Sequence, residues 1–230
     1  QDGTRFHRDW ARGDHAARLA LQAALGLSLT REVLADEYTL LVEDVADYWL
    51  LDALSTLLRA AGREGLDDRL VITPAGGGSA MALIGPVLAP ERRRVALLRT
   101  GQGEEEGVPP WMVEEGCVLT VGQALGADGP RSLEDVFPHA YYAEQVRAAY
   151  GLNGEWTHAG PVAPVAPVTV AAARRLAAIG ASPFDRRRVA RQLLQHIART
   201  PLPDLPLDAL DNAGRLVAAV NAIVRGWDAE

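Results

Sequence analysis

Short apolar runs alternate with longer amphipathic segments along the first two thirds of the chain. The runs are rich in Leu, Val and Ile, as is typical of buried strands. They lie at residues 40–42, 70–74, 95–98 and 117–120. Between the first runs, segments 48–61 and 81–88 have the apolar spacing of helices, and Gly62 follows the first of them as a helix end. This alternation predicts a doubly wound, mostly parallel α/β sheet with right-handed crossovers.

The same pattern divides the chain into four parts. We expect an N-terminal helical segment at 1–36, an α/β domain at 37–150, a Pro/Gly/Ala-rich linker at 151–169 and a helical appendage at 170–230. Three helices are expected in the appendage, at 170–180, 184–199 and 207–226. Because the chain starts at Gln1 rather than methionine, we expect it to be a fragment of something longer.

Composition excludes several classes of protein. The chain is 48% hydrophobic and 23% charged, which is ordinary for a globular protein. No apolar run approaches the roughly 20 residues of a membrane span, and no signal-peptide pattern opens the chain, so a cytoplasmic location is expected. Cys117 is the only cysteine, which excludes an internal disulfide and a cysteine zinc cluster.

All 23 basic residues are arginine. A lysine base, a Schiff base and a P-loop lysine are therefore excluded within these residues. The net charge of −7 argues against a broadly basic nucleic-acid surface, but a local arginine-lined groove is compatible with it. Candidate phosphate contacts lie at 92–94, 174–175 and 186–188, although solvated helix or loop ends explain them as well.

Two acids follow the first predicted strand at a spacing that brings them together. Glu43 lies at the strand end, and Asp47 lies four residues later in the first turn of the next helix. Paired carboxylates at the carboxyl edge of a parallel sheet suit a hard cation such as Mg²⁺. The alternative is that Glu43 and Asp44 cap the helix N-terminus and interact with its dipole.

Four short motifs occur in the order and spacing of one nuclease family. The family pattern LVEGxxD corresponds to Leu41–Asp47, and the xxPxGG turn corresponds to Ile72–Gly77. The IEDLF motif corresponds to Leu133–Phe137, and DKxxVA corresponds to Asp185–Ala190. With these motifs the chain resembles the Toprim domain of OLD-family (overcoming lysogenisation defect) ATP-dependent nucleases.

The resemblance implies a two-metal DNA nuclease. Glu43 and Asp47 would ligate one Mg²⁺ or Mn²⁺ ion, with Glu43 also placed for general acid/base work, and Glu134 and Asp135 would contribute to a second. Two such ions stabilise the attacking and the leaving oxygen of a phosphodiester. Arg186 stands where the family has a lysine that steadies the scissile phosphate. The resemblance also implies an ABC-type ATPase, fused upstream or supplied by a partner chain, and a homo-oligomer away from membranes.

The chain departs from the family pattern at the metal site. Arg99 and Gly101 stand where the third strand should end in two aspartates, and an arginine there should repel Mg²⁺. Asp44 replaces the glycine after the glutamate, where a side chain is expected to crowd the turn. Ser132 stands where many relatives place another acid.

Three hypotheses follow from these matches and departures. The first is an active nuclease whose metal is held by the four acids, helped by the acid run at 104–106. The second is a Toprim fold that has lost its chemistry and mediates dimerisation or binding of a partner. The third is a nucleotide-phosphate site at the glycine turn 75–79. We expect a nuclease-derived module with weakened or lost cleavage.

Trp111, beside the predicted cleft, is a further candidate for a functional residue. The five histidines have no metal-ligand spacing.

Overall fold

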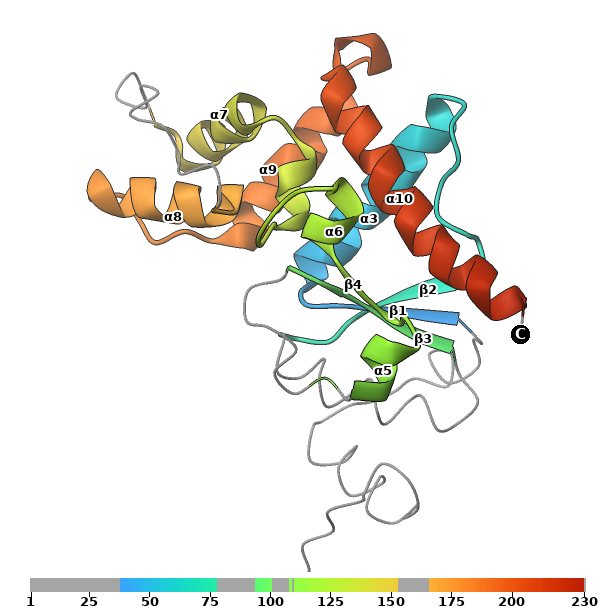
Figure 1. Ribbon diagram of the computed structural model, residues 1–230. Helices are drawn as coiled ribbons and strands as arrows, with labels where there is room; N and C mark the ends of the chain where they lie inside the picture. The colour runs from blue at the N-terminus through green and yellow to red at the C-terminus, as the bar shows by residue number, and fades with distance from the viewer. Residues whose placement is uncertain (1–37, 78–93, 101–107, 109, 153–165, 230) are drawn as a thin grey trace, which may run out of the picture.

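A parallel sheet with helices packed against it forms the centre of the computed structural model (Figure 1). The described residues are 38–77, 94–100, 108, 110–152 and 166–229. Several predicted features lie outside them. These are the N-terminal segment 1–36, the helix at 81–88, Arg92 and Arg93, Gly101, the acid run at 104–106 and most of the linker.

The sheet contains β1 (Tyr38–Val42), β2 (Leu70–Pro74), β3 (Arg94–Arg99) and β4 (Val118–Thr120). The strands are all parallel, in the order β2-β1-β3-β4, which confirms the predicted α/β class. Val42 pairs with Pro74 on one side and with Leu98 on the other, so these three strands end at the same edge. Every residue of β1 is buried, as expected for the inner strand of a parallel sheet covered on both faces.

Helix α3 (Val45–Ala60) begins three residues earlier than the sequence predicted. Asp44 is its N-cap: the carboxylate of Asp44 accepts from Ala46 N at 2.9 Å, and Asp47 accepts from Asp44 N at 2.8 Å. The capping alternative is therefore right for Asp44. The backbone of Asp44 is extended, so this position does not need the family's glycine, and the side chain does not crowd the turn. Gly62 follows the helix with a φ of 71°, which favours glycine.

Within the described residues, five further elements lie between β3 and α9 in addition to β4: one precedes β4 and four follow it. Two short helices, α5 (Pro110–Glu114) and α6 (Val121–Leu125), were not predicted. Thr120 and Gln123 form a capping box at the start of α6, a signal that the sequence does carry. The 3₁₀ turn η2 (Leu133–Val136) then leads into α7 (His139–Tyr150), and α8 (Val168–Ala178) begins inside the segment assigned to the linker.

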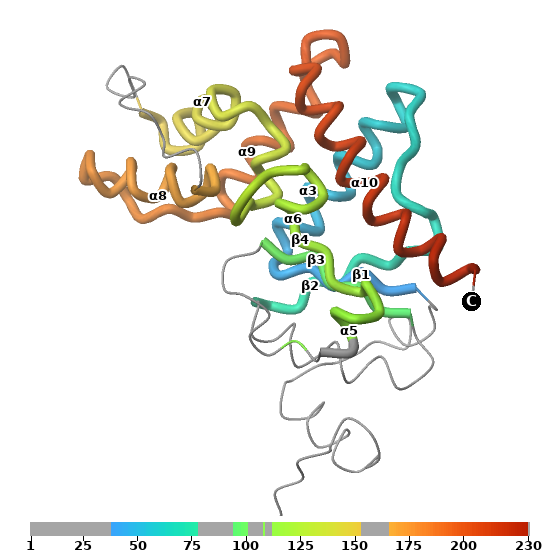
Figure 2. The backbone as a smooth tube through the Cα atoms, in the orientation of Figure 1, coloured from blue at the N-terminus to red at the C-terminus, as the bar shows by residue number. Residues whose placement is uncertain are grey.

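The C-terminal helices share one hydrophobic core with the sheet. They are α9 (Arg186–Arg199) and α10 (Leu207–Asp228), joined by the 3₁₀ turn η3 (Leu202–Asp204). Both helices pack against α3, and α10 crosses the face of the sheet that α3 and α6 also cover, whereas α5 lies on the other face (Figures 1 and 2). The predicted appendage is thus helical and is continuous with the α/β core.

Polar contacts fix the C-terminal third of α10. The buried Asn221 donates to Gly65 O at 2.9 Å and accepts from Asp67 N at 3.0 Å, which holds the loop before β2. At the end of the helix, Asp228 accepts from Tyr38 OH at 2.7 Å and forms an ion pair with Arg69. None of the helices in the described residues is long and apolar enough to cross a membrane.

The contact between Asp228 and β1 makes stability depend on pH. The Arg69 guanidinium, helped by the Tyr38 hydroxyl, lowers the pKa of Asp228 to about 2. A carboxyl with a lowered pKa stabilises the fold above its unfolded pKa of about 4 and loses this effect as the pH falls toward 2. We expect D228N to lower the melting temperature by no more than about 2 °C at pH 7, because the pair is partly exposed. Melting curves across pH 2–7 should show the difference from wild type vanish at the acidic end.

Candidate functional site

The carboxyl ends of β1 and β3 bring the first predicted site residue against the chain after β3. Glu43 follows β1, and one of its carboxylate oxygens accepts from Thr100 N at 2.9 Å and from Thr100 Oγ1 at 3.1 Å. Because β1 and β3 are neighbours that end in register, Thr100 falls beside Glu43. Glu43 therefore has a fixed position at the sheet edge, where ligands of such sheets bind.

Asp47 and Glu134 converge on a single cation, Arg186. The guanidinium of Arg186 donates to both oxygens of Glu134, at 2.6 Å from Nε and 2.9 Å from an Nη, and the same Nη donates to Asp47. Both acids are buried; Glu134 has no exposed surface. Two of the four predicted metal ligands are thus joined by an internal arginine.

Three elements that are far apart in sequence supply this cluster. Asp47 is the third residue of α3, where its other oxygen closes the capping box. Glu134 is the second residue of η2, and Arg186 is the first residue of α9, directly after its N-cap Asp185. The cluster therefore ties the first helix of the sheet domain to the C-terminal helices.

The electrostatics of the cluster keep Arg186 charged. Burial lowers the pKa of Arg186, but the charges and hydrogen bonds of Glu134 and Asp47 outweigh it and raise the pKa above its usual value. Tyr142 lies close by: burial, with the negative charge of Glu134, raises the pKa of its hydroxyl well above the usual range. Within the described parts of the chain, the Tyr142 hydroxyl has no hydrogen-bond partner.

Asp135 faces away from Arg186 and holds local backbone. Its carboxylate accepts from Ser132 N at 2.8 Å, from Ser132 Oγ at 2.7 Å and from Val168 N at 3.2 Å. His139 lies 3.9 Å from the same carboxylate. Asp135 thus fixes the start of η2 and the start of α8, and Ser132, in place of a family acid, is its partner.

A second arginine of α9 pairs with the turn after β1. Arg187 donates to both oxygens of Asp44, at 2.6 and 3.2 Å. This hydrogen bond is the main reason that the pKa of Asp44 is lowered. Together, Arg186 and Arg187 hold the N-terminus of α9 against the start of α3.

These contacts decide how well the predicted ligands fit a divalent metal. Glu43 is bound to Thr100, Asp47 and Glu134 share Arg186, and Asp135 holds backbone groups. Within the described ranges, no group of three or more His, Cys, Asp or Glu side chains is placed to hold a metal ion. As arranged, the four acids form an ion-pair and hydrogen-bond network around a guanidinium, and this arrangement does not fit a hard cation. Arg99 is buried at the end of β3, and Gly101 lies outside the described residues.

A groove opens beside Arg186 at the same end of the sheet. Its volume is about 290 Å³, and its polar lining residues are Thr100, Ser132, Thr169 and Arg186. The apolar lining residues are Val170, Ala173 and Phe184. Sequence reasoning missed Thr100 and the α8 residues of this groove. The sequence marked Thr100 as a residue of the sheet edge only by its position directly after a strand. The start of α8 was not predicted because it lies in the segment assigned to the linker.

Comparisons with known proteins give no match: no family model, no curated protein and no solved structure corresponds to this chain. The resemblance to the Toprim domain therefore remains a prediction based on the four motifs. In the structure, Leu41–Asp47 crosses from β1 into α3, and Ile72–Gly77 crosses from β2 into a turn in which Gly76 and Gly77 have positive φ. Such positions favour glycine.

Replacing Arg186 should destabilise the fold. R186M leaves the buried carboxylates of Asp47 and Glu134 without their cation, which should cost about 3 kcal/mol of unfolding free energy at pH 7. Urea unfolding at pH 7 measures the loss.

The matched control is R187M, which removes the exposed neighbouring arginine and its pair with Asp44. We expect only a small change from it, because exposed ion pairs contribute little. An R186M loss that is no larger than that of R187M would show that the cluster is not the constraint inferred here.

Proposed function

We propose that the chain is a Toprim module derived from an OLD-family DNA nuclease, in which metal-dependent phosphodiester hydrolysis is weakened or lost. The observation that carries this proposal is the contact of Arg186 with both Asp47 and Glu134. A guanidinium that cannot be deprotonated occupies the space between two of the acids that the resemblance assigns to metal. The fold class and the position of Glu43 at the sheet edge are compatible with it.

The energetics support weakening rather than an ordinary metal site. A cation that used Asp47 or Glu134 would first have to displace a half-buried arginine that is bidentate to Glu134, and leaving a buried carboxylate without its cation costs several kcal/mol. Mg²⁺ also gives up its own water reluctantly and demands near-octahedral oxygen geometry. Metal binding is weakened further because Arg99 and Gly101 supply no carboxylate at the end of β3.

A non-catalytic scaffold is the second candidate, and a specific observation favours it. The acids of the family motifs perform structural work here: Asp47 and Glu134 hold α9 through Arg186, and Asp44 does so through Arg187. Under either proposal the partners are those that the resemblance implies: an ABC-type ATPase, fused or separate, and a second copy of the chain. The proposal places the protein in the cytoplasm with DNA.

Plasmid cleavage tests the proposed function. Supercoiled plasmid is incubated with the wild-type protein and Mn²⁺, beside an E43A control, and nicked and linear products are quantified. We expect wild-type cleavage at or only slightly above the E43A background, because Arg186 occupies the acid cluster. Robust cleavage by the wild type that E43A abolishes would contradict weakening. A product level identical in both proteins would mean that cleavage is lost, and sedimentation analysis can then test the scaffold alternative through self-association.

Metal binding can be separated from cleavage by thermal melting. In R186M the acids gain negative potential and lose their internal cation, so Mn²⁺ should bind the folded variant and raise its melting temperature by a few degrees at millimolar metal. The wild type should respond much less. The further variant R186M/E134Q removes one of the released carboxylates and should lose most of the response. Equal responses of wild type and R186M would contradict the role assigned to Arg186.

A further inference from the structure

Positive charge is concentrated in the helices beside the acid cluster. Residues 139–152 and 166–200 carry eight arginines and only two acids, Glu144 and Asp185, a net charge of +6. The whole chain has a net charge of −7. Asp44, Asp47 and Glu134, which pair with Arg186 and Arg187, offset three of these charges, and the remainder leaves a local positive field on an otherwise acidic protein, which attracts polyanions.

One face of α9 presents four of these eight arginines to solvent. Arg187, Arg188, Arg191 and Arg199 are all exposed. At about 100° per residue they fall within an arc of about 120° around the helix axis. The opposite side of α9 is buried in the core through Val189, Ala190, Leu193 and Ile197. No acid occurs between Arg186 and Arg199, so nothing within the helix offsets the field of this arginine face.

Aromatic neighbours hold two of these arginines in place. Arg188 lies over the Tyr150 ring at 4.4 Å and also donates to Ala149 O at 2.8 Å. Arg191 lies over the Trp49 ring at 5.5 Å. Such contacts restrict the side chains without consuming their charge, which lowers the entropy lost when they bind a ligand.

The dimensions of the arginine face suit a nucleic-acid strand. The rise from Arg187 to Arg199 is about 18 Å along the axis, comparable to about five nucleotides of one strand. The face starts beside Arg186, and so beside the acid cluster and the groove lined by Thr100 and Phe184. A phosphate backbone lying along α9 would therefore lead to the proposed site.

We propose that the arginine face of α9 binds the phosphate backbone of duplex DNA. This rests on the proposed function for the identity of the nucleic acid.

The chemistry disfavours two other anionic partners. A protein partner would need an apolar centre, and the remaining exposed residues of the face, Gln195 and Ala198, do not supply one. A membrane-bound helix inserts its apolar side into lipid, and here that side lies in the core.

Binding of a fluorescein-labelled 20-base-pair duplex in EDTA, followed by anisotropy between 50 and 200 mM KCl, tests the proposal without metal or cleavage. R191Q/R199Q should bind about tenfold more weakly than wild type at 50 mM KCl. The slope of log K against log salt should fall by about 1.8, as expected when two phosphate contacts are lost. The charge-conserving R191K/R199K should keep the wild-type slope, because contacts to the DNA phosphate backbone need positive charge rather than the bidentate geometry of a guanidinium.

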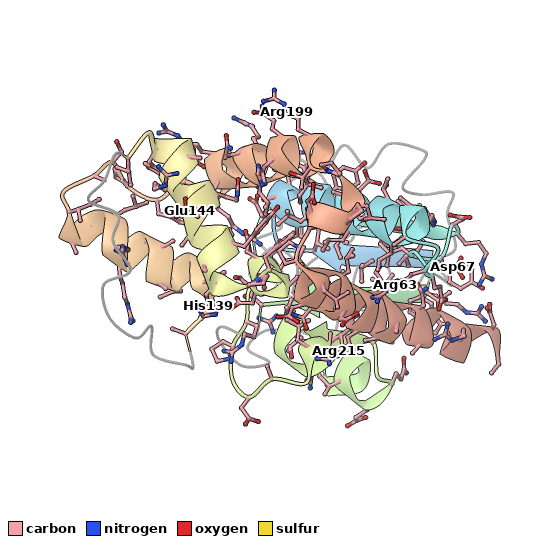
Figure 3. The ribbon with its side chains drawn as sticks, turned by 90° about the horizontal axis from the view of Figure 1, so that it is seen from above. Arg63, Asp67, His139, Glu144, Arg199 and Arg215 are labelled. Atoms are coloured by element: carbon pink, nitrogen blue, oxygen red, sulfur yellow. The ribbon has the colours of Figure 1, made fainter. Side chains whose placement is uncertain are left out.

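The matched control is R215Q/R225Q, which removes the same charge from the exposed side of α10. In the view from above, Arg199 and Arg215 lie on opposite sides of the molecule (Figure 3). The control should bind as wild type does, and melting curves should show that all variants are folded.

Three results would overturn the proposal. The first is no binding of the duplex by wild type at 50 mM KCl, and the second is an equal loss of affinity in R191Q/R199Q and R215Q/R225Q. The third is competition by poly-glutamate that is as effective as competition by unlabelled duplex, which would indicate an acidic protein partner. Because the binding assay contains no metal, a failure to bind DNA does not change what the plasmid assay says about cleavage. Conversely, absence of plasmid cleavage does not change what the anisotropy assay says about DNA binding.

Discussion

The ion-pair cluster of Arg186 with Asp47 and Glu134 is the constraint on which the arrangement of this molecule depends. It joins α3, η2 and α9, which are separated by long stretches of sequence, at the carboxyl edge of the sheet. A buried cluster of this kind contributes modest net stability, but removal of one member leaves uncompensated charge. It therefore selects one position for the N-terminus of α9, and this position places the arginine face beside the sheet edge.

The cluster also links the two functional proposals. If the acids of the family motifs hold an internal guanidinium, they are poorly available to a metal, and hydrolysis is weakened for an electrostatic reason. The same helix that supplies this guanidinium carries further arginines outward, where they can contact phosphates. A module that keeps contacts to a nucleic acid while losing its metal site would still serve an ATPase partner as a DNA-engaging subunit.

Much of the fold followed from local pattern. The four strands were predicted because each is a short apolar run with flanking turn signals, and α8 to α10 because their apolar residues recur at helical spacing. The start of α3 was predicted three residues late, although Asp44 and Asp47 form a capping box and capping had been an open alternative. The five-residue helices α5 and α6 were missed because such short segments show too little periodicity to be recognised.

Sequence alone determined the α/β class, the identity of the four candidate acids and the absence of lysine. The partners of those acids were decided only by the tertiary structure. Motif spacing brought Glu43, Asp47, Glu134 and Asp135 to one region, yet Asp135 faces the start of α8, and Glu43 faces Thr100. The sequence also suggested that Arg186 contacts phosphate, whereas in the fold it faces two carboxylates. A side chain's partner depends on how helices distant in sequence pack, and packing is fixed by the shared core rather than by any local pattern.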